Sequence, residues 1–170
     1  MNNIPTFQEN LRKGIEMENY FATALSKLKW ITCNYEIEQM EDSGRHTELK
    51  TDVTLTSPPE GKYPDLAFDV KGVGGTPVRV YVPLRRMYWV QQVNNNLAHG
   101  YIPFIAFPRY FITERSCKHP SNWYVMRMDK DTYVQYLNSY PHYDKLVRKS
   151  MRLTKLDGYL KKYIINRRKI

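Results

Sequence analysis

The sequence predicts an α/β protein in which helices flank a mixed β-sheet. Three observations lead to this fold class: a helical repeat of apolar residues near the N-terminus, two segments in which apolar and polar residues alternate, and an almost continuous apolar run further along the chain. The length of 170 residues is typical of one domain with its own hydrophobic core. Hydrophobic residues make up 42% of the chain, which excludes a disordered basic polypeptide.

The first expected element is a helix over residues 7–28. Thr6 and Glu9 have the spacing of a capping box. The apolar side chains at helical spacing are Leu11, Ile15, Ala22, Leu25 and Leu28. Glu18 lies inside or at the border of this apolar stripe, where a carboxylate is costly unless it is paired or binds a cation.

Two alternating segments follow a polar stretch over residues 38–48, which is predicted to be a loop. In residues 49–56, Asp52 lies on the polar face. In residues 66–71, Asp69 and Lys71 lie together on the polar face, because side chains two apart in a strand share a face. A turn over residues 57–62 separates the segments, so we expect two paired antiparallel strands.

The remaining elements are predicted from shorter patterns. They are a strand over residues 78–82, a helix over 84–97, a buried central strand over 102–107, a strand over 123–128, a short helix over 131–138 and a long basic helix over 143–165.

Positive charge is concentrated at the C-terminus. The whole chain carries a net charge of +9, but residues 144–170 contain 10 Lys and Arg against 2 Asp and Glu. We therefore expect a folded core over residues 1–143 and a basic helical extension over 144–170, which would contact DNA or form a dimer. The candidate phosphate contacts are Arg79, Arg85, Arg86, Lys145, Arg148, Lys149, Arg152 and Lys155, of which the last five are expected on one helical face.

The sequence also bears on location. No apolar run is long enough for a membrane span, and residues 1–5 lack the charged and apolar blocks of a signal peptide. A cytoplasmic protein is expected, in the host cell cytoplasm if a phage encodes it, with no membrane partner. Cys33 and Cys117 are then expected to be reduced thiols.

The paired strands predict a cluster of acids. Asp52 and Asp69 would repel each other unless a cation lies between them, and Mg²⁺ is commonly held by one or two carboxylates with water and a substrate phosphate. Such an ion polarises a phosphodiester and lowers the pKa of bound water. Lys71 would orient that water or neutralise the charge that develops on phosphorus. These are the parts for metal-dependent phosphodiester hydrolysis, with Mn²⁺ as an expected substitute.

This ordered set resembles the PD-(D/E)-x-K motif of restriction-endonuclease-like nucleases, and it is most similar to archaeal-type Holliday junction resolvases. The segments that carry the resemblance are residues 17–21, 50–55, 67–71, 88–92, 102–107 and 123–128, so the resemblance spans about residues 8–130. Two positions depart from the motif: Thr51 replaces the usual Pro, and Asp69 stands where many resolvases carry Glu.

The resemblance implies a restriction-endonuclease-like core and specific residue roles. Asp52, Asp69 and the Val70 carbonyl would bind the metal, and Glu18 would support it directly or through water. Lys71 would be the partner of the catalytic base. Gln91 or Gln92 would position DNA or water. Asp65 remains an alternative to Asp52, because Pro64 and Asp65 form a literal Pro-Asp pair only four residues before Asp69.

The expected function is therefore a Mg²⁺-dependent DNA endonuclease that acts as a homodimer on branched DNA in recombination and needs no organic cofactor. Three alternatives remain open at this point. They are a site-specific duplex endonuclease of a mobile element or phage, of the homing or restriction type; a non-catalytic DNA-binding protein with the same fold; and a protein that binds or cuts RNA.

Overall fold

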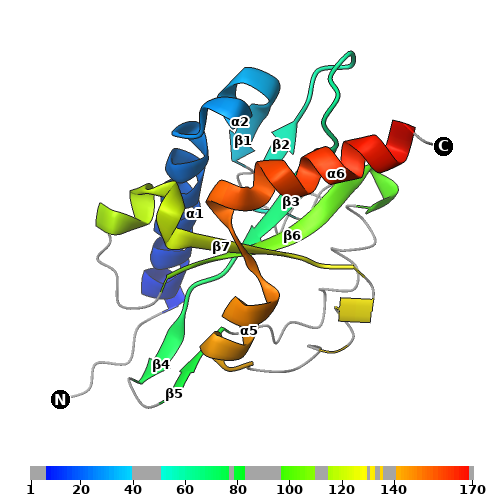
Figure 1. Ribbon diagram of the computed structural model, residues 1–170. Coiled ribbons are helices and arrows are strands. Elements are labelled where there is room, and N and C mark those ends of the chain that lie inside the picture. Colours follow the sequence, from blue (N-terminus) through cyan, green and yellow to red (C-terminus); the bar gives the residue numbers. More distant parts are fainter. Residues whose placement is uncertain are drawn as a thin grey trace.

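The computed structural model describes residues 7–39, 51–76, 79–82, 97–109, 115–129, 131–132, 135 and 141–168. Within these ranges the chain forms an α/β fold with a mixed six-stranded sheet in the order β1-β2-β3-β6-β7-β8 (Figure 1). A separate two-stranded sheet pairs β4 with β5. The predicted fold class, a mixed sheet flanked by helices, is confirmed at this level.

The large sheet begins with an antiparallel meander and continues with a parallel strand. Strands β1, β2 and β3 pair antiparallel in succession, β3 pairs parallel with β6, and β6, β7 and β8 again pair antiparallel. The strands are β1 (Glu36–Gln39), β2 (Val53–Thr56), β3 (Asp65–Val70), β4 (Gly74–Thr76), β5 (Arg79–Tyr81), β6 (Tyr101–Pro108), β7 (Trp123–Arg127) and β8 (Met151–Arg152).

Helices lie on both sides of this sheet. The α-helices are α1 (Phe7–Ser26), α2 (Lys29–Asn34), α5 (Tyr143–Lys149) and α6 (Leu156–Arg168), and the short 3₁₀ helices are η1 (Arg115–Lys118), η2 (Pro120–Asn122) and η3 (Leu153–Lys155). None of the described helices is both long and apolar enough to cross a bilayer.

Two hydrophobic clusters cover the two faces of the sheet. The larger cluster joins α1 and α6 to one face through Phe21, Phe68, Trp123 and Leu160. The smaller cluster joins α5 to the other face through Phe107 and Leu146 and their neighbours. Strand β6 contributes to both clusters, which confirms the prediction of a buried central strand.

The prediction of one long helix over residues 143–165 is wrong. Helix α5 ends at Lys149, and the chain then forms β8, η3 and α6. Leu146 packs in the smaller cluster, whereas Leu153 and Leu156 pack in the larger one. The segment must therefore pass around the sheet edge from one face to the other, which a single straight helix cannot do. Residue 143 marks a change in charge but not the limit of the hydrophobic core.

Other sequence predictions have mixed outcomes. The helix at residues 7–28 and the antiparallel pairing of the two alternating segments are confirmed by α1 and by β2 with β3. The loop prediction is wrong at residues 38–39, which belong to β1, and Ile15 is 48% exposed instead of facing the core. Most of the predicted helix over 84–97 lies outside the described residues, and residues 131–132 and 135 are the helical part described within 131–138.

Candidate active site

The predicted acids meet where β2 begins and β3 ends. Val53 pairs with Phe68, and this register places Asp52 beside Asp69. The Asp52 amide donates a 3.1 Å hydrogen bond to the Phe68 carbonyl, and the Thr51 hydroxyl donates a second bond of 2.9 Å to the same oxygen. Two hydrogen bonds to one carbonyl thus fix the backbone that carries Asp52, and Thr51 contributes one of them through its side chain.

Asp52 is held in an environment that disfavours its charge. The Val70 amide donates a 2.8 Å hydrogen bond to its Oδ2 atom. Burial raises the pKa of the Asp52 carboxyl well above its ordinary value, the neighbouring charge and hydrogen bond of Asp69 raise it further, and the Val70 amide opposes this shift. A half-buried acid beside a second acid is a group that a cation would stabilise.

Lys71 supplies a positive charge to this cluster. Its Nζ atom lies 3.1 Å from Oδ2 of Asp69, and the two side chains are 5% and 18% exposed. The Lys71 amide also donates a 2.8 Å hydrogen bond to the Ala106 carbonyl, which continues the pairing of β3 with β6 beyond the end of the strand. The ammonium group is therefore held by a rigid backbone next to the acids.

Glu18 approaches the same cluster from α1. Its side chain is half-buried, and its charge adds to the effects that raise the pKa of Asp52. The structure thus brings together all four residues that the sequence singled out: the helix acid, the two strand acids and the lysine.

The donor set fits a hard cation such as Mg²⁺. Within the ranges described above, no three or more His, Cys, Asp and Glu side chains converge closely enough to hold a metal ion by themselves. Mg²⁺ does not need such a cage, because it is commonly bound by one or two carboxylates with several waters. Asp52, Asp69 and the Val70 carbonyl are the groups that would hold it, and Glu18 would support it directly or through water.

Asp65 lies away from this cluster. It begins β3, whereas Asp69 is near the end of the same strand. Its Oδ1 atom accepts a 2.8 Å hydrogen bond from the Ser57 amide, across the connection between β2 and β3. The structure therefore places Asp52, and not Asp65, beside Asp69.

The predicted phosphate contacts are divided among several elements. Lys145, Arg148 and Lys149 lie on α5, Arg152 on β8 and Lys155 on η3, and all five are exposed. The expectation that they share one helical face is wrong, because the helix is interrupted after Lys149. Arg79 lies on β5. Arg85, Arg86, Gln91 and Gln92 lie outside the described residues.

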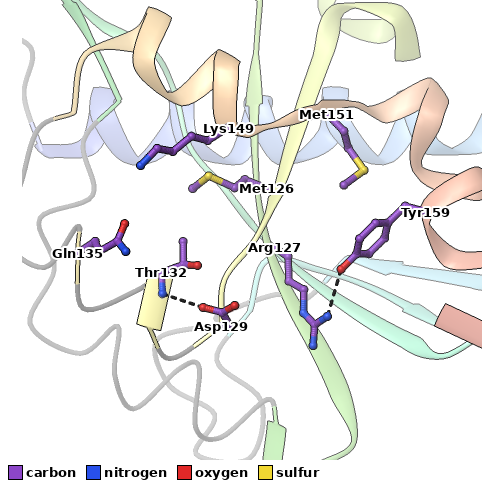
Figure 2. Close-up of a pocket in the computed structure, with 8 residues that line it drawn as sticks. All are labelled: Met126, Arg127, Asp129, Thr132, Gln135, Lys149, Met151 and Tyr159. Atoms are coloured by element: carbon purple, nitrogen blue, oxygen red, sulfur yellow. Dashed lines mark hydrogen bonds between the residues drawn. The ribbon is translucent and has the colours of Figure 1, made fainter. Parts of the chain in front are cut away.

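A cavity of about 350 Å³ lies elsewhere on the molecule, beside β7, β8 and α6 (Figure 2). In it, Arg127 Nη1 lies 3.1 Å from the Tyr159 hydroxyl, and Asp129 accepts a 2.7 Å hydrogen bond from the Thr132 amide. Hydrogen bonds from Thr132 lower the pKa of the Asp129 carboxyl. The cavity shares no residue with the acidic cluster, and no motif in the sequence indicated it. Its lining residues are Met126, Arg127, Asp129, Thr132, Gln135, Lys149, Met151 and Tyr159.

Comparisons with protein-family models, with curated proteins and with solved structures give no match to this chain.

Proposed function

We propose that this protein is a metal-dependent endonuclease that hydrolyses phosphodiester bonds in DNA. The observation that carries the proposal is the position of Asp52, which is half-buried beside Asp69, within the electrostatic influence of Glu18, and close to the Lys71–Asp69 ion pair. Acids arranged in this way oppose each other's ionisation, and a divalent cation would relieve that cost. A purely structural role does not explain why three acids and one lysine lie together where β2 begins and β3 ends.

Each residue has a definite task in this proposal. When bound, the metal would polarise the phosphodiester and lower the pKa of a water molecule. Asp52 and Asp69 hold the cation, and the Val70 amide keeps Asp52 oriented. Lys71 offers a positive charge to the phosphate as negative charge develops on it. Water adds to phosphorus and one P–O bond of the backbone breaks, which leaves a phosphate monoester and a hydroxyl group.

The topology supports a restriction-endonuclease-like core. An antiparallel meander is followed by a strand parallel to its last member, and the acids lie where β2 begins and β3 ends. This arrangement agrees with the resemblance to archaeal-type Holliday junction resolvases, so branched DNA is the first substrate to test. A homodimer is part of the proposal, since resolution of a junction requires two cuts.

A cleavage panel tests the proposal. The full-length protein is incubated with Mg²⁺ or Mn²⁺ and a four-way junction, a flap, a plasmid, single-stranded DNA, or RNA of the same sequence. We expect cutting of DNA by the wild type and loss of cutting in Asp52→Asn and Asp69→Asn. Glu36→Gln is the matched control, because Glu36 is an exposed acid that pairs with Thr56 at the opposite end of β2.

The panel also separates the alternatives. Cutting of the plasmid at defined sites without a preference for junctions would identify a duplex endonuclease of the homing or restriction type. DNA binding with no cutting at any metal concentration would contradict the enzymatic proposal and indicate a DNA-binding protein, and cutting of RNA alone would change the substrate class.

A further inference from the structure

The acids lie at the end of the sheet where β3 finishes, and β6 finishes at the same end. Strands β3 and β6 are parallel, and the Lys71 amide bonds to the Ala106 carbonyl. Arg109 follows β6 directly, is exposed, and has its amide fixed by a 2.7 Å hydrogen bond to the Asn122 carbonyl. Three residues of strand place Arg109 about 10 Å beyond Ala106 along the strand direction.

The turns between β6 and β7 lie at this same end of the sheet. Pro108 at the end of β6 pairs with Trp123 at the start of β7, so η1 and η2 must lie beyond these strand ends. The Trp123 indole anchors the turns through a 2.6 Å hydrogen bond to the Cys117 carbonyl. Figure 1 shows them as the yellow-green turns beside α1, the helix that carries Glu18. Arg115 and Lys118 are exposed on η1.

The C-terminal segment adds further cations at this end of the sheet. Strand β8 runs antiparallel to β7, so it leads the chain toward the start of β7. The next element, η3, packs against η2. Arg152 and Lys155 are both exposed in this part of the chain. We call the set Arg109, Arg115, Lys118, Arg152 and Lys155 the basic rim.

The described segments that carry the basic rim contain no acidic residue. Among residue 109 and residues 115–122 and 150–155, which carry all five cations, there is no Asp or Glu. Several cations at the same end of the sheet as an acidic cluster suit a ligand with regularly spaced negative charges that must be held close to a metal. The phosphate backbone of a nucleic acid has this character.

We propose that the basic rim binds the DNA phosphates that flank the bond to be cut. This inference rests on the proposed function and deepens it, because it assigns the strand path to Arg109, Arg115 and Lys118 in addition to Arg152 and Lys155. Lys145 and Arg148 are not counted in the rim because they lie on α5, which Leu146 attaches to the smaller hydrophobic cluster. The rim is built from two parts of the chain that are far apart in the sequence, residues 109–118 and residues 152–155.

DNA binding by charge-reduced variants tests the rim. The affinity of the full-length protein for a short duplex and for a four-way junction is measured in EDTA, so that no cutting occurs, over a range of salt concentrations. We expect Arg115→Gln with Lys118→Gln to weaken binding by about tenfold. The slope of log affinity against log salt should become shallower by about 0.9 for each phosphate that the variant no longer neutralises.

The matched control is Lys27→Gln with Lys29→Gln, which removes the same charge from exposed positions where α1 ends and α2 begins. These positions lie at the far end of the sheet, where the Tyr35 hydroxyl bonds to the Pro64 carbonyl before β3 begins. The control should bind with almost the wild-type affinity and slope. Arg109→Gln with Arg152→Gln is a second rim variant, which avoids the contact of Lys118 with the Tyr20 ring at 5.9 Å.

The outcomes separate this inference from the proposed function. Weaker binding by both rim variants supports the rim, even if the wild type cuts no DNA. Wild-type binding by both rim variants overturns it, even if Asp52→Asn abolishes cutting. An equal loss in the Lys27 and Lys29 control also overturns it, because the effect would then follow net charge alone. A wild type that binds no DNA overturns the choice of partner.

Discussion

The backbone amide of Val70 donates a 2.8 Å hydrogen bond to Oδ2 of Asp52, where the two strands bring their acids together. The Val70 side chain packs against the larger hydrophobic cluster, while its neighbours Asp69 and Lys71 form the ion pair. One strand therefore serves the core and the site through alternate residues. Because the core fixes β3, it also fixes the distance between the acids and the lysine.

The first prediction concerns Asp52 and pH. The pKa of this carboxyl is raised in the folded protein above its ordinary value of 3.8. Its contribution to stability is therefore fully present below about pH 3.8 and is lost as the pH rises through the raised folded pKa. Asp52→Asn removes this loss, so the metal-free variant should melt above the metal-free wild type at pH 7, by about 2–4 °C for each 1 kcal/mol of stability recovered. Thermal melts in EDTA at several pH values measure the difference.

Magnesium should reverse the order of the two melting temperatures, so that the wild type melts above Asp52→Asn. A ligand that binds only the folded state at ten times its dissociation constant stabilises it by about 1.4 kcal/mol. The wild type should gain melting temperature as Mg²⁺ is added, and Asp52→Asn should gain little. An equal gain in both proteins would place the metal elsewhere.

The second prediction concerns Lys71. Lys71→Met keeps much of the side-chain volume but removes the charge that lies 3.1 Å from Asp69. Loss of a positioned charge that stabilises a transition state costs about 10²–10³ in rate, so cutting should fall by at least about 100-fold. DNA binding in EDTA should change little, because the Lys71 side chain is only 5% exposed. If Lys71→Met cut DNA as fast as the wild type, the role given to Lys71 would be wrong even though the enzyme is active.

Lys71→Met also changes the fold energetics, and its melting temperature must be known before the rate is interpreted. The double variant Lys71→Met with Asp69→Asn removes both charges of the buried pair, so it should be more stable than Lys71→Met alone. Both variants should be inactive. This pattern would assign the loss of cutting to the chemistry and not to unfolding.

The third prediction separates Asp65 from the site. Asp65→Ala removes the acceptor for the Ser57 amide, so the free energy of unfolding should fall by about 1 kcal/mol. Cutting and the stabilisation by Mg²⁺ should be unchanged below the melting temperature. Chemical denaturation and the cleavage assay measure the two effects, and a loss of Mg²⁺ stabilisation would return Asp65 to the metal site.

Local patterns in the sequence predict that Asp52, Asp69 and Lys71 lie together, as the structure shows. Alternation in residues 49–56 and 66–71 fixes which side chains share a face, and the short turn between them fixes the antiparallel pairing that brings Asp52 to Asp69. Helical periodicity located α1 and with it Glu18, although Ile15 shows that an apolar position at the right spacing can lie beyond the core.

The face of the sheet against which each apolar side chain packs could not be predicted from local patterns in the sequence. Leu146 and Leu153 fit one helical stripe in the sequence, but they pack on opposite faces of the sheet. Periodicity reports the spacing of apolar residues and not the surface against which each one packs. The basic rim could not be predicted from the sequence for the same reason, because Arg109, Lys118 and Lys155 reach the same end of the sheet only when the sheet has formed.

The last prediction concerns the basic C-terminal segment. Removal of residues 144–170 would delete Leu146, Leu153, Leu156 and Leu160, all of which are fully buried. Burial of each such side chain contributes about 1.5–3 kcal/mol, so the total is comparable with the roughly 5–15 kcal/mol that stabilises a typical domain. The truncated chain should therefore be unfolded or aggregated, as circular dichroism and size-exclusion chromatography would report. A variant with Lys161→Gln and Lys162→Gln removes charge from exposed positions of α6 and should stay folded. A truncated chain with a cooperative melt near the wild-type temperature would show that residues 144–170 are an appendage and not part of the core.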